Sequence, residues 1–183
     1  MNNFIPIHGG YQKLLTYQRA EIIFDATIYF TNRFLSKKDR TVDQMVQAAR
    51  SGKQNIVEAS MASGTSKEFE IKLTNVARAS QEELLIDYLD YMRNHDLKVW
   101  DKSHPYAARM NDLVRNEPAT YQTFKKGIEN QSPEICTNVI VGLIKVTQFL
   151  LFRQIKFLEK DFLQNGGLRE RMSKARIQTR NRS

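Results

Sequence analysis

Apolar and small side chains recur at helical spacing along residues 41–92 and predict two amphipathic helices. In the first helix the face consists of Val42, Met45, Val46, Ala49, Ile56, Val57 and Ser60. In the second it consists of Phe69, Leu73, Val76, Ala77, Ser80, Leu84, Tyr88 and Tyr91. A short polar break containing Gly64 separates the two stretches, so the helices are expected to be antiparallel neighbours.

Capping signals predict where these two helices begin. Thr41 is followed three residues later by Gln44, and Thr65 is followed three residues later by Glu68. Both pairs have the pattern of a capping box. The first helix also contains Gly52 in a run of small residues, where glycine costs about 1 kcal/mol of helix propensity relative to alanine. We therefore expect this position to serve close packing or contact with a partner.

Two further long helices and an insertion are predicted in the rest of the chain. Residues 11–35 carry two apolar faces, which indicates either a deeply buried helix or one that also contacts another subunit. The last helix is expected to begin after Ser132, with Pro133 in its first turn, and to end near residue 164, before Gly166 and Gly167. Residues 95–131 contain two short helical patterns, marked by Ala107, Met110 and Val114 and by Tyr121, Phe124 and Ile128.

These elements predict an all-α fold, an antiparallel up-down four-helix bundle with a short helical insertion before the last helix. Residues 1–167 would form the bundle domain, with the insertion at about 95–131, and residues 168–183 a basic C-terminal tail. The apolar run 135–152 is long enough to consider as a membrane span. Polar residues interrupt it, at Asn138, Lys145, Thr147 and Gln148. Burial inside the bundle is therefore expected, and no membrane.

The cysteine count and the N-terminus favour a cytoplasmic protein. Cys136 is the single cysteine of the chain, so no internal disulfide can form. The first ten residues lack the positive and apolar regions of a signal peptide. Near a helix start, the Cys136 thiol is a candidate for a lowered pKa, but no histidine lies beside it in the sequence.

Positive charge is concentrated at the C-terminal end. The chain of 183 residues has a net charge of +8. Residues 1–144 contribute 18 Lys/Arg and 17 Asp/Glu, whereas residues 145–183 contribute 10 Lys/Arg and 3 Asp/Glu. Such asymmetry is typical of a basic arm that binds a polyanion, and a tail that only aids solubility is the alternative.

The candidate nucleic-acid-binding residues follow from this charge distribution. The first group lies in the tail and consists of Arg169, Arg171, Lys174, Arg176, Arg180 and Arg182. Arginine dominates it, and the planar guanidinium suits phosphate oxygens. Further candidates are Lys145, Arg153, Lys156 and Lys160 on the last helix and Arg50 and Lys53 on the second.

The sequence contains no recognisable catalytic, cofactor or metal motif. It has no Gly-rich phosphate loop, no HExxH and no GxSxG. Glu58 has no visible base beside it and is expected to pair with Arg50, Arg78 or Lys53, while Asp101 and His104 are only a weak acid-base pair. Carboxylates at Glu83, Asp87 and Asp90 are expected to form a solvated acidic face, which is also suited to docking a basic segment of a neighbour. We therefore expect no enzyme, no cofactor and no metal.

A family resemblance is carried by the two helices of residues 41–92. Its residues are Ser51, Asn55, Ile56 and Glu58, then Ser66, Lys67, Glu68, Phe69, Leu73, Ala77, Arg78, Ser80, Glu83 and Leu84. This pattern resembles the signature of the four-helix bundle family known from proteins encoded by intervening sequences in 23S rRNA genes. That family is similar to the accessory variability protein of diversity-generating retroelements. The family usually has Gly where Ala59 stands, and Ala, the better helix former, preserves the expected fold.

The resemblance implies a homopentameric barrel with RNA as ligand and a reverse transcriptase as a further partner. Together with the charge, it predicts a non-catalytic, oligomeric nucleic-acid-binding accessory or adaptor protein. The ligand would be RNA or DNA, with RNA favoured. The alternative is a protein-interaction scaffold of another mobile or defence element that binds no nucleic acid.

Overall fold

The computed structural model describes residues 5, 8–101, 103–108, 110 and 119–181. Every secondary-structure element among them is helical, which confirms the all-α prediction. The elements are η1 (Tyr11–Lys13), α1 (Leu15–Phe34), α2 (Arg40–Ala62), α3 (Lys67–Asn94), α5 (Tyr121–Ile128), α6 (Pro133–Asn165) and α7 (Leu168–Arg180).

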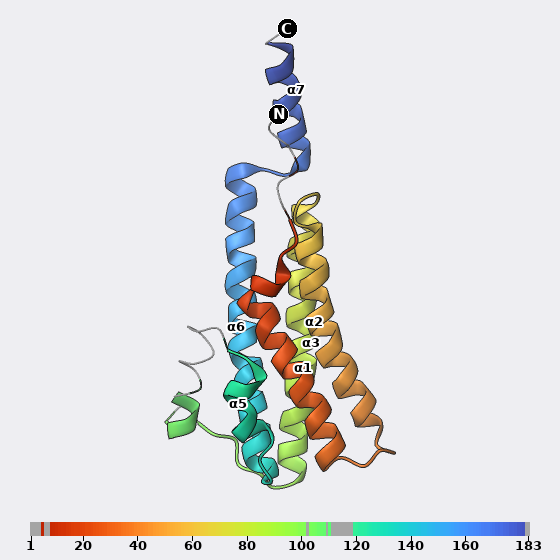
Figure 1. Cartoon of the computed structure of the whole chain (residues 1–183), viewed down its shortest axis with the longest axis vertical. Coiled ribbons are helices and arrows are strands. Elements are labelled where there is room, and N and C mark those ends of the chain that lie inside the picture. Colours follow the sequence, from red (N-terminus) through yellow and green to blue (C-terminus); the bar gives the residue numbers. More distant parts are fainter. Residues whose placement is uncertain (1–4, 6–7, 102, 109, 111–118, 182–183) are drawn as a thin grey trace.

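The four longest helices, α1, α2, α3 and α6, lie side by side (Figure 1). The most extensive contacts are those of α2 with α3 and of α3 with α6, and α1 packs against both α2 and α6. In this arrangement α2 lies diagonally opposite α6. The short helix α5 covers α6 and α1 near one end, and α7 extends beyond the other end.

An aromatic cluster fills the core between α1 and α3. The ring of Phe30 lies 4.9 Å from that of Tyr88 and 4.9 Å from that of Tyr91. The buried Tyr88 hydroxyl donates a hydrogen bond to Thr27 Oγ1 at 3.1 Å. Burial raises the pKa of Tyr88 well above its ordinary value. The cluster therefore combines ring packing with a satisfied polar group, which fixes the register of the two helices.

Close packing joins α2 to α3. A Cβ added to Gly52 would overlap Gln81 Nε2, so any larger residue there must displace the buried Gln81 side chain. Beside it, the Ser51 and Ser80 hydroxyls are 3.0 Å apart, and Asn55 Nδ2 donates to the Ser51 carbonyl at 2.8 Å. Several residues of the family-like pattern therefore serve this helix contact. The expectation that Gly52 serves close packing is confirmed.

The first residues of three helices differ slightly from the prediction. The cap of α2 is Asp39, whose Oδ1 accepts from Thr41 N at 2.9 Å, and the cap of α3 is Ser66, whose Oγ accepts from Phe69 N at 3.1 Å. The capping boxes predicted at Thr41 and Thr65 are therefore wrong, because a better-placed cap residue stands two positions before Thr41 and one position after Thr65. The predicted helix 11–35 is divided into η1 and α1.

The insertion is tied to α6 and α1 by polar contacts. Asn138 accepts from Trp100 N at 2.7 Å and donates to the Lys98 carbonyl at 2.8 Å. The fully buried Arg19 donates to the Ala119 carbonyl at 3.3 Å. The second helical pattern is confirmed as α5, which buries Phe124 and Ile128. Of the first pattern, Val114 lies outside the described residues.

The last long helix also meets a simple test for a membrane span. Within Pro133–Arg180 one 18-residue window is long and apolar enough to cross a membrane, and 61% of that window is buried inside the protein. A core helix buried against its neighbours has the same length and apolar composition, so this stretch is only weak evidence for a membrane-spanning helix.

Candidate nucleic-acid interface

Four cations lie along the outer face of α6. Lys145, Arg153, Lys156 and Lys160 are all exposed. Their spacing of eight, three and four residues places them on one side of a helix with 3.6 residues per turn. The opposite side of α6 carries its buried apolar residues, so these cations point away from the core.

Phenylalanine rings alternate with these cations, a feature that the charge analysis missed. Phe149, Phe152 and Phe157 are 41%, 47% and 69% exposed. The Arg153 guanidinium lies over the Phe149 ring at 5.9 Å, and the Lys156 ammonium lies over the Phe152 ring at 5.8 Å. We call this set, from Lys145 to Lys160, the aromatic-cationic strip. Its sequence signal was present, since helical spacing places Phe149 and Phe152 beside the cations and Phe157 at the edge of their face, about 140° around the helix from Phe152.

One ion pair occurs on the strip itself. Lys156 Nζ lies 2.9 Å from Glu159 Oε2, with both side chains about half exposed. In water such an ion pair contributes roughly 0–1 kcal/mol to stability, so Lys156 can readily leave Glu159 and bind a phosphate instead. Among the described residues, no ion pair holds Lys145, Arg153 or Lys160.

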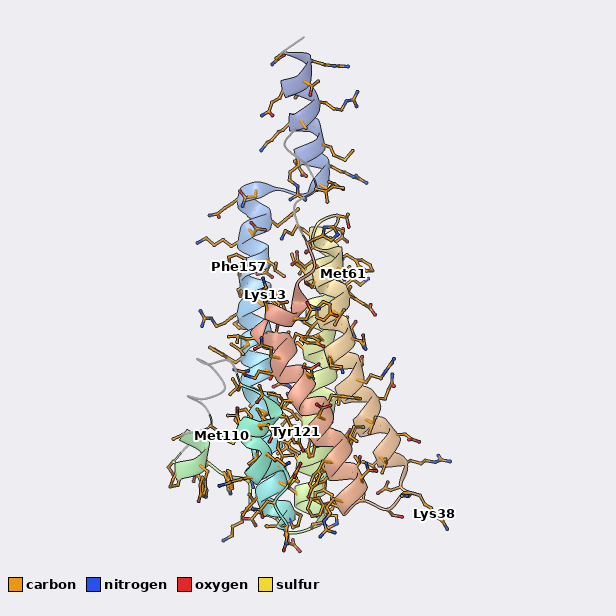
Figure 2. All side chains as sticks on the ribbon, in the orientation of Figure 1. Lys13, Lys38, Met61, Met110, Tyr121 and Phe157 are labelled. Carbon is orange, nitrogen blue, oxygen red and sulfur yellow. The ribbon has the colours of Figure 1, made fainter. Side chains whose placement is uncertain are left out.

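The tail forms a helix, α7, with no buried residue. Gly166 has φ +67°, a backbone conformation that favours glycine, and it separates α6 from α7. Glu170 Oε2 accepts a hydrogen bond from Gly167 N at 3.0 Å and so caps the new helix. Figures 1 and 2 show α7 projecting beyond the other helices, with side chains spread around it.

Three arginines share one side of α7. Arg169, Arg176 and Arg180 are seven and four residues apart and exposed, and Lys174 is exposed on a different side. Arg182 lies outside the described residues. This helix therefore presents a cationic row whose only acidic neighbour, among the described residues of α7, is the capping Glu170.

Arg171 does not belong to this exposed row of arginines. Its Nη2 donates to the Gly64 carbonyl at 3.3 Å, which connects the first turn of α7 to the turn between α2 and α3. The side chain is half-buried, and its charge helps to lower the pKa of the Asp161 carboxyl. Arg171 therefore positions α7 and contributes little to a free cationic surface.

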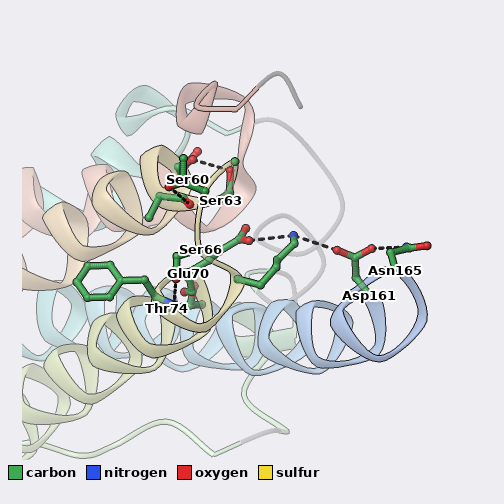
Figure 3. A network of polar contacts seen from close by, with 12 residues as sticks. Ser60, Ser63, Ser66, Glu70, Thr74, Asp161 and Asn165 are labelled. Carbon is green, nitrogen blue, oxygen red and sulfur yellow. Dashed lines mark hydrogen bonds and ion pairs between the residues drawn. The ribbon is translucent and has the colours of Figure 1, made fainter. Parts of the chain in front are cut away.

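A polar network holds the end of α6 against the start of α3 (Figure 3). Lys67 Nζ lies 2.9 Å from Glu70 Oε2 and 2.9 Å from Asp161 Oδ2, and Asn165 donates to Asp161 at 2.7 Å. The Asn165 hydrogen bond and then Lys67 lower the pKa of Asp161. Burial alone would lower the pKa of Lys67, but the hydrogen bonds with Asp161 and Glu70 raise it. Both groups are thus held in their charged forms.

The candidates on α2 lie apart from the strip. Arg50 is exposed on α2, diagonally across from α6. Lys53 is half-buried, with Nζ 4.3 Å from the centre of the Phe24 ring on α1. Burial raises the pKa of the Asp25 carboxyl, and Lys53 acts against that shift. Lys53 therefore serves the contact between α1 and α2, and the structure does not bring either residue to the α6–α7 surface.

An acidic groove lies between α2 and α3. Its volume is about 620 Å³, and its lining includes Asp43, Glu83 and Asp87. Burial, followed by the charges of Asp90 and Glu83, raises the pKa of Asp87. Glu83, Asp87 and Asp90 thus interact as one acidic face, as the helical spacing predicts. Among the described residues, no three His, Cys, Asp or Glu side chains are grouped to hold a metal ion.

The contacts of Asp101, His104 and Glu58, the weak catalytic candidates, are those of a local turn and of an exposed helix position. Asp101 Oδ1 accepts from Ser103 N at 2.8 Å, from Ser103 Oγ at 2.6 Å and from His104 N at 3.1 Å, which makes it a turn cap. The His104 ring stacks on Trp100 at 4.3 Å. Glu58 is exposed, and no ion pair joins it to the expected Arg50, Arg78 or Lys53 within the described part of the chain.

The environment of Cys136 corrects one expectation. Burial raises the pKa of the Cys136 thiol to about 12, so the idea of a lowered pKa at the helix start is wrong. The thiol is fully buried, and desolvation outweighs any effect of the nearby helix end.

Comparison of the chain with known proteins identifies no relative. No protein-family model, curated protein or solved structure matches the chain.

Proposed function

We propose that this chain is a non-catalytic, oligomeric accessory protein that binds nucleic acid, with RNA as the expected ligand. The observation that carries the proposal is the cationic surface of α7 and α6. Arg169, Arg176 and Arg180 line one side of a helix that buries nothing. A helix of that kind contributes little to a core, whereas its charges suit a phosphate backbone.

The strip on α6 extends this surface. Lys145, Arg153, Lys156 and Lys160 face solvent on the helix that leads directly into α7. Phosphate contacts of Lys and Arg side chains supply most of the sequence-independent affinity for nucleic acid. No base-reading motif is visible, so binding should tolerate many sequences.

The family resemblance supplies the proposed bundle topology and the proposed oligomer. The four long helices would be the antiparallel up-down bundle, and five copies would form the homopentamer that the resemblance implies. Support comes from the α2–α3 contact, where Ser51, Asn55 and Ser80 of the family-like pattern meet across two helices. A ring would repeat the cationic surface and so strengthen individually weak contacts. A reverse transcriptase is the further partner that the resemblance implies, and a cytoplasmic location remains part of the proposal.

Removal of α7 tests the proposal. A chain that ends at Gly167 should keep the packing of its long helices and its number of subunits, because α7 buries no side chain. Its affinity for RNA should fall. The slope of log K against log salt should also flatten, by about 0.7 for each lost phosphate contact on a single strand. Anisotropy titrations at several salt concentrations measure both effects. Equal affinity and equal slope for the two chains would remove α7 from the binding surface.

A protein-interaction scaffold is the second candidate. The exposed side of α3 carries Phe69, Val76 and Ile86, which are 51%, 39% and 49% exposed, so the prediction that Phe69 and Val76 belong to the buried face is wrong. They lie on the helix that also bears the acidic face. Exposed apolar residues rimmed by charge are typical of protein contacts. A full-length protein that binds no RNA or DNA at low salt would favour this candidate.

A further inference from the structure

We infer that the aromatic-cationic strip binds single-stranded nucleic acid in preference to duplex, with its phenylalanine rings stacking on the bases. The inference rests on the proposed function and specifies the form of the ligand. It starts from an unusual exposure, since Phe149, Phe152 and Phe157 keep 41%, 47% and 69% of their surface in water. Partly exposed rings beside cations combine the two contacts that a single strand offers, a base face and a phosphate.

The dimensions of the strip suit a short single strand. At a rise of 1.5 Å per residue, Lys145 and Lys160 lie about 22 Å apart along the axis. About six nucleotides span that length at the 3.4 Å spacing of a stacked strand. Phe149 and Phe152 are about 4.5 Å apart along the axis, and Phe157 follows about 7.5 Å later. The axial distance between neighbouring rings is therefore larger than one base step, so one base cannot occupy two rings.

The cations strengthen this arrangement. The Arg153 guanidinium lies over Phe149 and the Lys156 ammonium over Phe152, so two of the three rings have a positive group on one face. A guanidinium plane can itself stack on a base, and both cations can turn toward a phosphate. Rings and charges are thus close enough to contact the same nucleotide.

A duplex cannot use the rings in this way. Its bases are stacked on one another and show only their edges in the grooves. The strip follows the convex surface of a single helix, and its phenylalanines offer no hydrogen bond to a base edge. A duplex would therefore contact only the cations, and a single strand would gain the stacking in addition.

The competing occupant is a second copy of the chain, docked through its acidic α3 face. The positive charge of the strip would attract either occupant, because among its described residues only Glu159 is acidic and it already pairs with Lys156. The exposed rings between the cations favour nucleic acid, since they offer faces on which bases stack. Stacking needs a ring, whereas a protein contact needs only apolar area. Replacing the rings by leucine therefore distinguishes base stacking from a contact between two copies of the chain.

The test uses the full-length chain with the triple variant Phe149→Leu, Phe152→Leu and Phe157→Leu. Fluorescence anisotropy gives the affinity for a 12-nucleotide oligouridine and for a 12-base-pair RNA duplex. One lost stack lowers affinity by about fivefold to 150-fold, so the triple variant should bind the oligouridine at least about tenfold more weakly. Its affinity for the duplex should stay within about twofold. Phe69→Leu, a comparably exposed ring on α3, is the matched control and should change neither affinity.

The outcomes separate this inference from the proposed function. A wild-type protein that binds both ligands, with a triple variant that binds oligouridine equally well, overturns the stacking and leaves the proposed function intact. A wild-type protein that binds neither ligand overturns both. A triple Phe→Ala variant with a lower mass in light scattering, where the wild type is oligomeric, assigns the strip to a contact between copies and also overturns the inference.

Discussion

The two halves of α6 are both rich in apolar residues, yet they have opposite surroundings. In the first half, from Cys136 to Thr147, every side chain except that of Lys145 is buried. Among the described neighbours, α1, α3 and α5 enclose it, and α5 packs so tightly that a Cβ on Gly127 would overlap Val139. In the second half only Leu151, Ile155 and Leu158 are buried, while the phenylalanines between them face solvent. The number of neighbouring helices, rather than the apolar content, therefore decides which part is core and which part is free to bind.

The largest expected effect comes from truncating one residue in each half. Ile144→Ala, at a side chain with 0% exposure, should lower the free energy of unfolding by about 2–5 kcal/mol. Phe157→Ala should change it by no more than about 0.5 kcal/mol, although it removes more atoms. Urea denaturation of both variants measures the difference. Equal losses would show that the second half is covered by a partner in solution.

Helix packing outside α6 gives the next effect. Gly52→Leu should destabilise the protein by about 1–3 kcal/mol, because the side chain must displace Gln81 between α2 and α3. Ala79→Leu, on the exposed side of α3, is the control and should be nearly neutral. Thermal unfolding followed by circular dichroism compares the two variants. A Gly52→Leu protein with an unchanged Tm would contradict the tight contact.

A smaller effect is expected where the second half of α6 is held to α3. Asp161→Asn should cost about 1 kcal/mol at neutral pH, since it weakens the hydrogen-bonded pair with Lys67. The pKa of Asp161 is lowered in the folded state, so its stabilisation is present above the unfolded pKa of about 3.9 and is lost as pH falls through the folded value. The gap between wild type and variant should therefore close on acidification. Urea curves at neutral pH and near pH 3 measure that gap.

An exposed pair on the same helix provides the control for this prediction. Glu159→Gln removes the partner of Lys156, with both side chains about half exposed, and should change stability very little. A loss at Glu159 equal to the loss at Asp161 would show that the Lys67 network has no special role in fixing the end of α6.

The reactivity of thiols compares the two halves of α6 with the smallest expected effect on stability. Burial raises the pKa of Cys136 to about 12, so a thiol reagent at pH 8 should modify it only when the protein opens. A second thiol at the exposed Phe157→Cys position should react within the mixing time. The ratio of the two rates measures how rarely the first half opens. Rapid labelling of Cys136 in the unaltered protein would contradict its enclosure.

The sequence was informative about local features. Helical periodicity predicted the long helices, and α6 ends within about one residue of the expected position because Pro133 and Gly166 mark its limits. The caps were misplaced by one or two residues, since Asp39 and Ser66 compete with Thr41 and Thr65 as cap residues. Local chemistry alone does not decide between such neighbours.

The interface residues were predicted only in part, for a non-local reason. The cations could be found from charge, but the exposure of the phenylalanines depends on where α5 ends against α6. The docking role of Arg171 depends on Gly64, which lies 107 positions earlier in the chain. Such contacts follow from packing and leave no periodic signal near the residue itself.

The turn between α2 and α3 has a practical consequence for handling the protein. Gly9 N donates to the Ser60 carbonyl at 3.1 Å, and Arg171 reaches the Gly64 carbonyl, so the first described residues and the start of α7 lie at the same pole of the molecule, from which α7 projects. An affinity tag or dye fused to either terminus would thus crowd the basic arm. The exposed Lys37 and Lys38 between α1 and α2 lie at the opposite pole. That turn is the better attachment point for immobilisation or labelling.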